Sequence, residues 1–179
     1  MGNRFENTKT SANLLTAFAG ESMARNKYTF FASAARKEGY EEIARIFEET
    51  AANEKEHAEI WFKLMEQLGS TEFNLKSASE GEHYEWSDMY KTFAQDARDE
   101  NFHDVAALFE NTAKVEKLHE DRFNQCMKKV QEKTVFASTE SVKWKCLNCG
   151  FELEGKEPPE VCPLCSHPKA YFKNESCAQ

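Results

Sequence analysis

Residues 10–133 carry apolar side chains at alternating steps of three and four, the spacing of helices that pack in a bundle. The pattern predicts four helices, with the ranges Thr10 or Ser11 to Lys37, Tyr40 to Leu68, Ser79 to Asp99, and Phe102 to Lys133. Gly39 suits a left-handed helix end, so the first two helices are expected to run antiparallel. Gly69 ends the second helix and Asn101 marks a short turn. Residues 69–78 lack the pattern, and ten extended residues reach about 33–36 Å, enough to cross much of a bundle.

The second and fourth predicted helices repeat one another. The stretch Glu54-Lys55-Glu56-His57 returns as Glu116-Lys117-Leu118-His119, and each lies on an inward stripe that matches the other at an offset of 62 residues. The third helix resembles the first more loosely, because Gly20-Glu21 corresponds to Gly81-Glu82 while Tyr28 corresponds to Tyr90 with one residue inserted between. Glu85 has no counterpart. These matches predict a duplicated helix pair and an all-α four-helix bundle.

The inward stripes contain ionisable groups that are too costly to bury without a partner. Glu and His three residues apart lie on one helix face, so both side chains can bind the same partner group or ion. A single such residue is more often a solvated edge residue. The joint arrangement, with two Glu-x-x-His pairs and a Glu on each remaining helix, matches the ligand pattern of carboxylate di-iron or di-manganese bundles. We expect two metal ions, held by Glu21, Glu54, His57, Glu82, Glu85, Glu116 and His119.

A second metal site is predicted after the helices. Cys146 and Cys149 form one C-x-x-C pair, and Cys162 and Cys165 form a second pair after twelve intervening residues. The segment is too short for a core of its own, and four thiolates suit either a structural zinc or a single iron. The aromatic residues around the pairs favour the iron alternative, because they are typical of rubredoxin: Trp144, Phe151, Tyr171 and Phe172. His167 is not needed as a ligand.

The remaining cysteines and histidines have no comparable pattern. Cys126 replaces a leucine on the inward stripe and is expected to be a buried thiol, and Cys177 is expected to be free. His83 and His103 are expected to be exposed. The predicted domains are a helical bundle over residues 1–137, a linker over 138–141 and a small metal-binding domain over 142–179.

Charge and hydropathy exclude several functions. The 179 residues have a net charge of −8 and a mean hydropathy of −0.74. No basic face is visible for nucleic acid, and no apolar stretch approaches the roughly 18 residues of a membrane span. Met1–Thr10 has no apolar run of a secretion signal, and paired cysteines in metal spacing are typical of a reducing compartment. We expect a soluble, cytoplasmic protein.

Taken together, these motifs resemble the rubrerythrin family over nearly the whole chain. The residues that carry the resemblance are Ala19-Gly20-Glu21-Ser22 with Ala24-Arg25-Asn26, Glu54-x-x-His57, Glu82-x-x-Glu85-Trp86, Glu116-x-x-His119, and the cysteine pairs up to Phe172. The resemblance implies a ferritin-like di-iron domain with a C-terminal rubredoxin-like domain. It also implies a peroxidase that reduces hydrogen peroxide to water and protects against oxidative stress.

The resemblance assigns roles to individual residues. It implies that Glu54 and Glu116 bridge the irons, that Glu21 and Glu82 are terminal ligands, and that His119 binds the iron nearer Glu82. The other iron would be bound by Glu85 when oxidised and by His57 when reduced. Tyr28 and Tyr90 match tyrosines that hydrogen-bond the ligands.

The implied partners are a second copy in a head-to-tail homodimer and an external electron donor, either rubredoxin or an NAD(P)H-dependent reductase. The alternative function is a ferroxidase or iron-handling protein with a structural zinc knuckle. The cysteine domain favours the peroxidase, because iron storage has no need of a one-electron relay.

Overall fold

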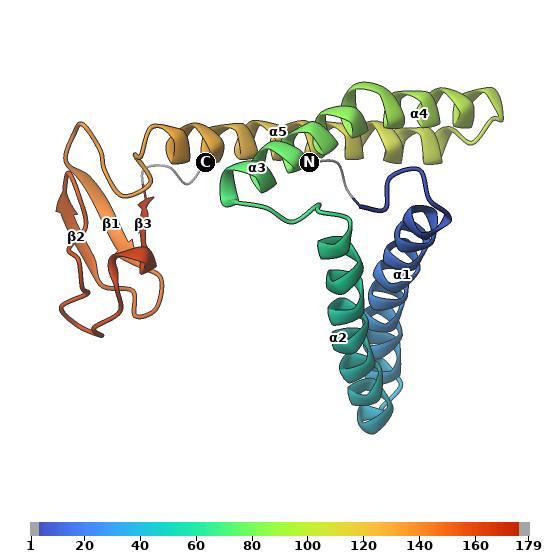
Figure 1. The fold of residues 1–179 in the computed structure, drawn as a ribbon, viewed down its shortest axis with the longest axis horizontal. Coiled ribbons are helices and arrows are strands. Elements are labelled where there is room, and N and C mark those ends of the chain that lie inside the picture. Colours follow the sequence, from blue (N-terminus) through green and yellow to red (C-terminus); the bar gives the residue numbers. More distant parts are fainter. Residues whose placement is uncertain (1–3, 176–179) are drawn as a thin grey trace. The chain divides into compact units, whose positions relative to one another are not determined.

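The computed structural model describes residues 4–175, and the chain forms two compact units, Met1–Ser70 and Thr71–Gln179. The first unit is a hairpin of α1 (Lys9–Lys37) and α2 (Glu41–Leu64), which lie side by side in Figure 1. The side chain of Thr8 caps α1 by accepting a hydrogen bond from the backbone N–H of Ser11 at 3.1 Å. The helix therefore begins slightly before the predicted Thr10 or Ser11.

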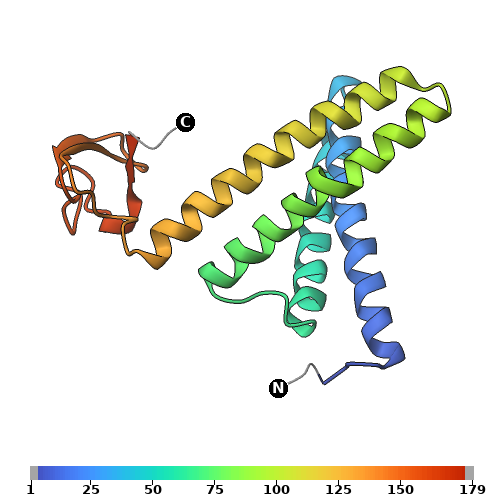
Figure 2. The ribbon, with the colours of Figure 1, turned by 90° about the horizontal axis from the view of Figure 1, so that it is seen from above.

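The second unit contains a second helix hairpin. Its first arm consists of α3 (Thr71–Tyr84), a π-helical turn η1 (Glu85–Met89) and α4 (Tyr90–Asp99). Its second arm is α5 (His103–Gln131), along which the first arm lies in Figure 2. The predicted loop over residues 69–78 is therefore wrong from Thr71 onward, where helical hydrogen bonding has already begun.

Four helix ends share one geometry, in which a left-handed residue is followed by a backbone N–H that bonds five residues back. The left-handed residues are Gly39, Glu66, Asn101 and Lys133, with φ values of 88°, 58°, 68° and 57°. The following N–H groups donate to the carbonyls of Ala35, Phe62, Ala97 and Lys129. The predicted end of the second helix at Leu68 and Gly69 is wrong, because this motif stops α2 at Leu64.

Small side chains line the contact between the arms of each hairpin. The buried residues of the first hairpin include Ala32, Ala35, Ala44, Ala51 and Ala58, and those of the second include Ser79, Ala94, Ala97 and Ala106. Small residues let the two backbones approach closely. Larger apolar residues beside these seams stay exposed, including Ile46 at 57% and Leu108 at 65%.

The two hairpins repeat the same side-chain contacts. Phe47 lies against Tyr28 and Phe31, with ring centroids 6.2 Å and 5.6 Å apart. Phe109 lies against Tyr90 and Phe93 at 6.0 Å and 5.6 Å. Arg36 pairs with Glu48 as Arg98 pairs with Glu110. The structure thus supports the duplication predicted from the sequence.

The C-terminal part of the second unit is a three-stranded antiparallel sheet. Its strands are β1 (Val142–Cys146), β2 (Glu152–Gly155) and β3 (Phe172–Asn174), in the order β2-β1-β3. A 3₁₀ turn, η2 (Lys169–Tyr171), precedes β3. Trp144 is fully buried and donates its indole N–H to the Gly155 carbonyl at 2.9 Å, so the core of this small sheet is an aromatic ring among cysteines.

The elements confirm the predicted fold class, a ferritin-like set of four helices followed by a small rubredoxin-like sheet. β1 begins at Val142, where the predicted second domain begins, while the domain division itself stays a prediction. Among the described residues no helix is long and apolar enough to cross a membrane.

Candidate metal centres

The first hairpin brings together Glu21 from α1 with Glu54 and His57 from α2. One potential ligand atom from each lies within 4.8 Å of the others. His57 Nδ1 is 2.8 Å from Glu54 Oε2 and 4.0 Å from Glu21 Oε1. The Glu54 side chain is 17% exposed and His57 is 52% exposed, so the imidazole faces outward from the pair.

The second hairpin holds an equivalent group of Glu82, Glu116 and His119, again within 4.8 Å of one another. His119 Nδ1 is 2.7 Å from Glu116 Oε2 and 3.6 Å from Glu82 Oε2. Burial and the neighbouring Glu116 carboxylate raise the pKa of Glu82 above its ordinary value. Two carboxylates this close need a cation to be charged together, and imidazole with carboxylate suits iron.

Glu85 occupies the first residue of the π-helical turn, three residues after Glu82. A π turn contains one residue more than the α-helix around it. This explains why Glu82 matches Glu21 at an offset of 61 residues whereas Tyr90 matches Tyr28 at 62. Glu85 is half-buried, and its charge contributes to the raised pKa values of Glu82 and Tyr90. It therefore lies beside the second group of ligands.

The predicted tyrosines occupy equivalent positions in the two hairpins. Tyr28 and Tyr90 are half-buried, each against the phenylalanine of the facing helix. Burial, followed by the charges of Glu85, Glu116 and Glu82, raises the pKa of Tyr90. The Tyr90 phenol is therefore held neutral near the carboxylates, in the protonation state that can donate a hydrogen bond.

One polar cluster near the second group was not predicted from the sequence. The Trp86 indole N–H donates to Glu120 Oε2 at 2.5 Å, and His83 Nδ1 lies 3.1 Å from Glu120 Oε1. The indole donor first, and then His83, lowers the pKa of Glu120. The position equivalent to Glu120 in the first hairpin is Ala58, so comparison of the two repeats offered a signal for this asymmetry.

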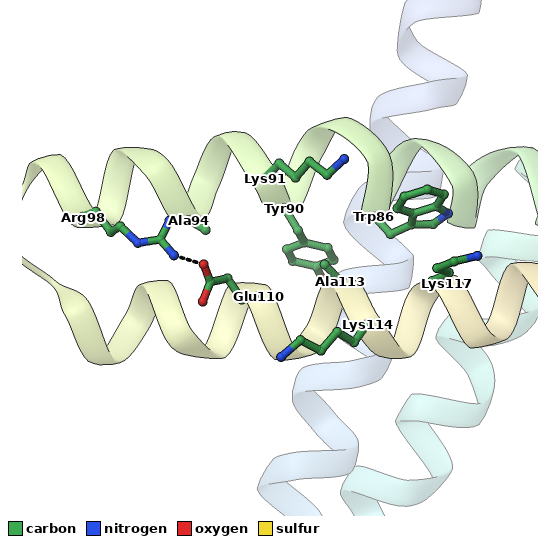
Figure 3. A pocket seen from close by; sticks show the side chains of 9 residues that line it. All are labelled: Trp86, Tyr90, Lys91, Ala94, Arg98, Glu110, Ala113, Lys114 and Lys117. Carbon is green, nitrogen blue, oxygen red and sulfur yellow. Dashed lines mark ion pairs between the residues drawn. The ribbon is translucent and has the colours of Figure 1, made fainter.

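A cavity of about 630 Å³ lies between the arms of the second hairpin, and Figure 3 shows its lining. Trp86 and Tyr90 face it from one arm, and Lys114 and Lys117 face it from α5. The Nζ atoms of Lys91 and Lys117 lie 5.3 Å and 5.1 Å from the Trp86 ring centre. Glu82, Glu116 and His119 do not line this cavity, whereas Tyr90 lines it and also lies near the carboxylates of Glu82, Glu85 and Glu116.

Four cysteines converge beside the small sheet, from two loops of the same construction. Cys146 Sγ is 3.7 Å from Cys165 Sγ, and Cys149 Sγ is 3.7 Å from Cys162 Sγ. A tetrahedral ion with bonds of about 2.3 Å requires sulfur separations of about 3.8 Å. Gly150 and Ser166 follow the second cysteine of each pair with φ values of 77° and 59°. The loops are therefore already shaped for a four-coordinate metal.

The electrostatics of the cysteines also fit a cation. The backbone N–H of His167 lowers the pKa of Cys165 to about 6. The backbone N–H of Phe151 favours the Cys149 thiolate, but desolvation and the other three cysteines outweigh it and raise the Cys149 pKa to about 12. Four thiolates cannot coexist there without positive charge. The His167 ring packs against Tyr171, with ring centroids 4.5 Å apart.

The other predicted residues have mixed outcomes. Cys126 is exposed, so the predicted buried thiol is wrong. Cys126 lies on the same face of α5 as Glu116 and His119. Within the hairpin, the other arm covers that face only in part. His83 and His103 are exposed as predicted, although His83 contacts Glu120. Cys177 lies outside the described residues.

These features define a class of protein with ferritin-like carboxylate and histidine ligands on its helices and a rubredoxin-like four-cysteine site. A family model named Rubrerythrin matches residues 12–127 and 73–147, and one for the rubredoxin-like domain of rubrerythrin matches residues 144–173. The chain belongs to the rubrerythrin family.

Two rubrerythrins align with this chain over nearly their full length. The rubrerythrin of Porphyromonas gingivalis is 46% identical over 97% of this chain and 93% of its own, and rubrerythrin-1 of Clostridium acetobutylicum is 48% identical over 93% and 94%. A solved structure of nigerythrin in a mixed-valent state is 34% identical, covers 96% of this chain and 89% of its own, and superposes with a TM-score of 0.36.

Proposed function

We propose that this protein is a non-haem di-iron peroxidase that reduces hydrogen peroxide to water with electrons relayed through its four-cysteine site. The observation that carries the proposal is the presence of two equivalent Glu-Glu-His groups and a preformed tetrathiolate site in one chain. A metal-storage function would account for the first feature and leave the second without a role. Membership of the rubrerythrin family supports the same function.

The residue roles follow from the resemblance to the rubrerythrin family. In this proposal Glu54 and Glu116 would be shared by the two irons, Glu21 and Glu82 would each bind one of them, and His119 would bind the iron nearer Glu82. Glu85 and His57 would be alternative ligands of the other iron. A ferrous ion has less positive charge than a ferric ion, so it favours the neutral imidazole over the carboxylate.

The two irons, when bound, supply the two electrons that convert one hydrogen peroxide and two protons into two waters. The protein's own groups prepare the site for this reaction. The proposal gives Tyr28 and Tyr90 the role of hydrogen-bond donors to the ligand carboxylates, and their rings pack against Phe47 and Phe109.

The electron path is proposed to run between two chains of a head-to-tail homodimer. Helix α5 continues for twelve residues beyond His119 to Gln131, or about 18 Å. The cysteine site therefore begins well away from His119 of its own chain. An external donor, rubredoxin or an NAD(P)H-dependent reductase, would reduce the cysteine-bound iron in the cytoplasm as part of protection against oxidative stress.

Metal analysis combined with a peroxide assay tests the proposal. We expect two irons at the carboxylate ligands and one at the cysteines per chain, the red colour of a ferric tetrathiolate, and reductase-dependent loss of hydrogen peroxide. Zinc at the cysteines together with oxidation of added ferrous iron would instead establish the alternative, an iron-handling protein with a structural knuckle. An iron-loaded protein that leaves peroxide unchanged would refute the peroxidase.

A further inference from the structure

We infer that the cavity between the arms of the second hairpin binds a nucleotide. The ring of the nucleotide lies against Trp86 and Tyr90. Its phosphates lie among Lys91, Lys114 and Lys117. The inference goes beyond the proposed function, because it concerns a second site on the hairpin and a ligand that is neither a metal nor a peroxide.

The cavity and the metal ligands of α5 lie on different faces of that helix. Successive residues of an α-helix are turned by about 100°. Lys114, two residues before Glu116, therefore points nearly away from that carboxylate. Lys114 and Lys117 line the cavity, whereas Glu116 and His119 do not. A molecule in the cavity can thus bind without displacing a metal ligand.

The cavity has the size and the lining of a small-molecule site. Its volume is about 630 Å³, and sites for small ligands usually enclose about 300–1,000 Å³. Ala94 and Ala113 face each other from the two arms and leave the space that larger side chains would fill. Figure 3 shows Arg98 and Glu110 at one end and Trp86 at the other. A bare phosphate would contact only part of this lining, whereas a nucleotide also covers its apolar part.

The cavity carries an excess of positive charge although the chain has a net charge of −8. The residues that line it include one carboxylate and four cationic side chains, namely Glu110, Lys91, Arg98, Lys114 and Lys117. Glu110 pairs with Arg98, and Lys117 Nζ lies 3.5 Å from Asp121 Oδ2. Lys114 Nζ donates to the amide oxygen of Asn111 at 3.0 Å. Within residues 4–175 no ion pair includes Lys91 or Lys114, so both ammonium groups remain available to an anion.

Two of the cations meet at one indole ring. The Nζ atoms of Lys91 and Lys117, one from each arm, lie 5.3 Å and 5.1 Å from the centre of the Trp86 ring. Glu120 accepts the indole N–H at 2.5 Å and offsets part of this charge. A phosphate group carries about −1.5 to −2 charges at neutral pH, and lysine binds phosphate as a compact point charge. A phosphate beside the ring therefore relieves the repulsion between the two lysines.

The first hairpin shows that these lysines are not needed to build such a hairpin. At the offset of 62 residues, Thr29 stands where the second hairpin has Lys91, and Ala52 stands where it has Lys114. The cavity at the corresponding place has a volume of about 250 Å³ and is lined by Arg25, Thr29, Glu48, Ala51, Ala52 and Lys55. The two lysines and the larger volume thus distinguish the second hairpin from a repeat that has the same helical framework.

Calorimetric titration of the iron-loaded, full-length protein with adenosine diphosphate tests the inference. We expect one site per chain with a Kd below about 1 mM. Added salt should weaken the binding, because it screens the charges of exposed lysines. Pyrophosphate and adenosine each carry one part of the ligand, and each should bind at least about tenfold more weakly than adenosine diphosphate.

The decisive variant gives the second hairpin the residues of the first. Lys91→Thr with Lys114→Ala should raise the Kd for adenosine diphosphate at least about tenfold. The matched control, Lys76→Thr with Lys128→Ala, removes the same charge from exposed positions of the same unit that do not line the cavity. The control should leave the Kd within about twofold of the wild-type value. Circular dichroism checks folding, and if helicity falls the two single changes are measured, each with an expected rise of at least about threefold.

Four results would overturn the inference. No heat at 1 mM adenosine diphosphate, written as about 1 mM of ligand, would show that the cavity takes no nucleotide. Unchanged affinity in the variant with Lys91→Thr and Lys114→Ala would place the ligand elsewhere, as on the irons through its phosphates. Equal affinity for pyrophosphate would define a site for anions without a ring. Binding of polyglutamate in place of adenosine diphosphate would define a surface for an acidic protein. The peroxide assay is read separately, so each of these results leaves the proposed peroxidase function as it stands.

Discussion

His119 Nδ1 lies 2.7 Å from Glu116 Oε2, and the pair is repeated 62 residues earlier by His57 and Glu54 at 2.8 Å. Each imidazole is within hydrogen-bonding distance of a carboxylate that is also a candidate ligand. A metal replaces this contact, because it binds the carboxylate oxygens and the imidazole lone pair directly. Binding therefore has to displace any shared proton.

Metal uptake is expected to release protons, and affinity is expected to fall as the pH falls. The raised pKa of Glu82 means that its proton persists to higher pH than on an ordinary glutamate, so metal has to displace it. Calorimetric titration of the metal-free protein in two buffers with different ionisation enthalpies measures the release. Glu82→Gln should release fewer protons, and identical release from both proteins would show that Glu82 is already ionised.

Glu85→Ala is expected to retain two irons and to lose peroxide turnover by about 10- to 100-fold, because an alternative ligand is removed while the six others remain. Iron content and peroxidase rate are measured on the same samples. Glu80→Ala is the matched control, since Glu80 is exposed on the same arm of the hairpin and its side chain pairs with Lys76 at 3.7 Å. Unchanged turnover in Glu85→Ala would remove Glu85 from the mechanism.

Cys146→Ser is expected to abolish the red tetrathiolate colour and to unfold the segment after Lys143, while the helical circular dichroism stays nearly unchanged. The small sheet has a core of only a few side chains around the four cysteines, so its stability depends on the metal. Cys126→Ser controls for the loss of a thiol, because Cys126 is exposed and distant in sequence from the four ligands. A collapse of the helical signal would mean that helices and sheet fold as one unit.

Trp86→Phe is expected to lower the free energy of unfolding at neutral pH by about 1 kcal/mol, through loss of the indole hydrogen bond to Glu120. The pKa of Glu120 is lowered in the folded protein, so its stabilisation is present above the unfolded value of about 4.3. It disappears as the pH falls through the folded pKa. Thermal unfolding of both proteins between pH 7 and pH 3 should therefore converge at acid pH, whereas a constant difference would assign the loss to packing alone. His103→Ala, at an exposed position, controls for the loss of a polar side chain.

The two Glu-Glu-His groups could be predicted from the sequence because the two copies of the repeat have the same residue spacing. Glu54 and His57, and their copies, interrupt an otherwise apolar stripe at the same point, and no knowledge of tertiary structure is needed to see this. The C-x-x-C pairs are equally local, since each loop places its two sulfurs by its own backbone geometry.

The start of α3 was not predictable in this way. Residues 71–78 lack a clear apolar period, and their helix is fixed by contacts with α5 such as that of Glu72 with Gln131, some sixty positions later in the sequence. The end of α2 was missed because Glu66 adopts a left-handed conformation without being glycine or asparagine. The exposure of Cys126 was missed because an apolar stripe indicates which face of a helix points inward. It does not indicate which other residues cover that face.

The π-helical turn at Glu85–Met89 bears on how the two halves of the chain diverged. If the two hairpins were identical copies, their Glu-Glu-His groups would be identical too. Nothing in the chain would then distinguish one group from the other. One extra residue in a single helix adds a carboxylate on one side only. The turn absorbs that residue locally, so Tyr90 and the rest of α4 keep the phase of the ancestral helix. The extra residue thus makes the two Glu-Glu-His groups unequal while the rest of each repeat keeps its register.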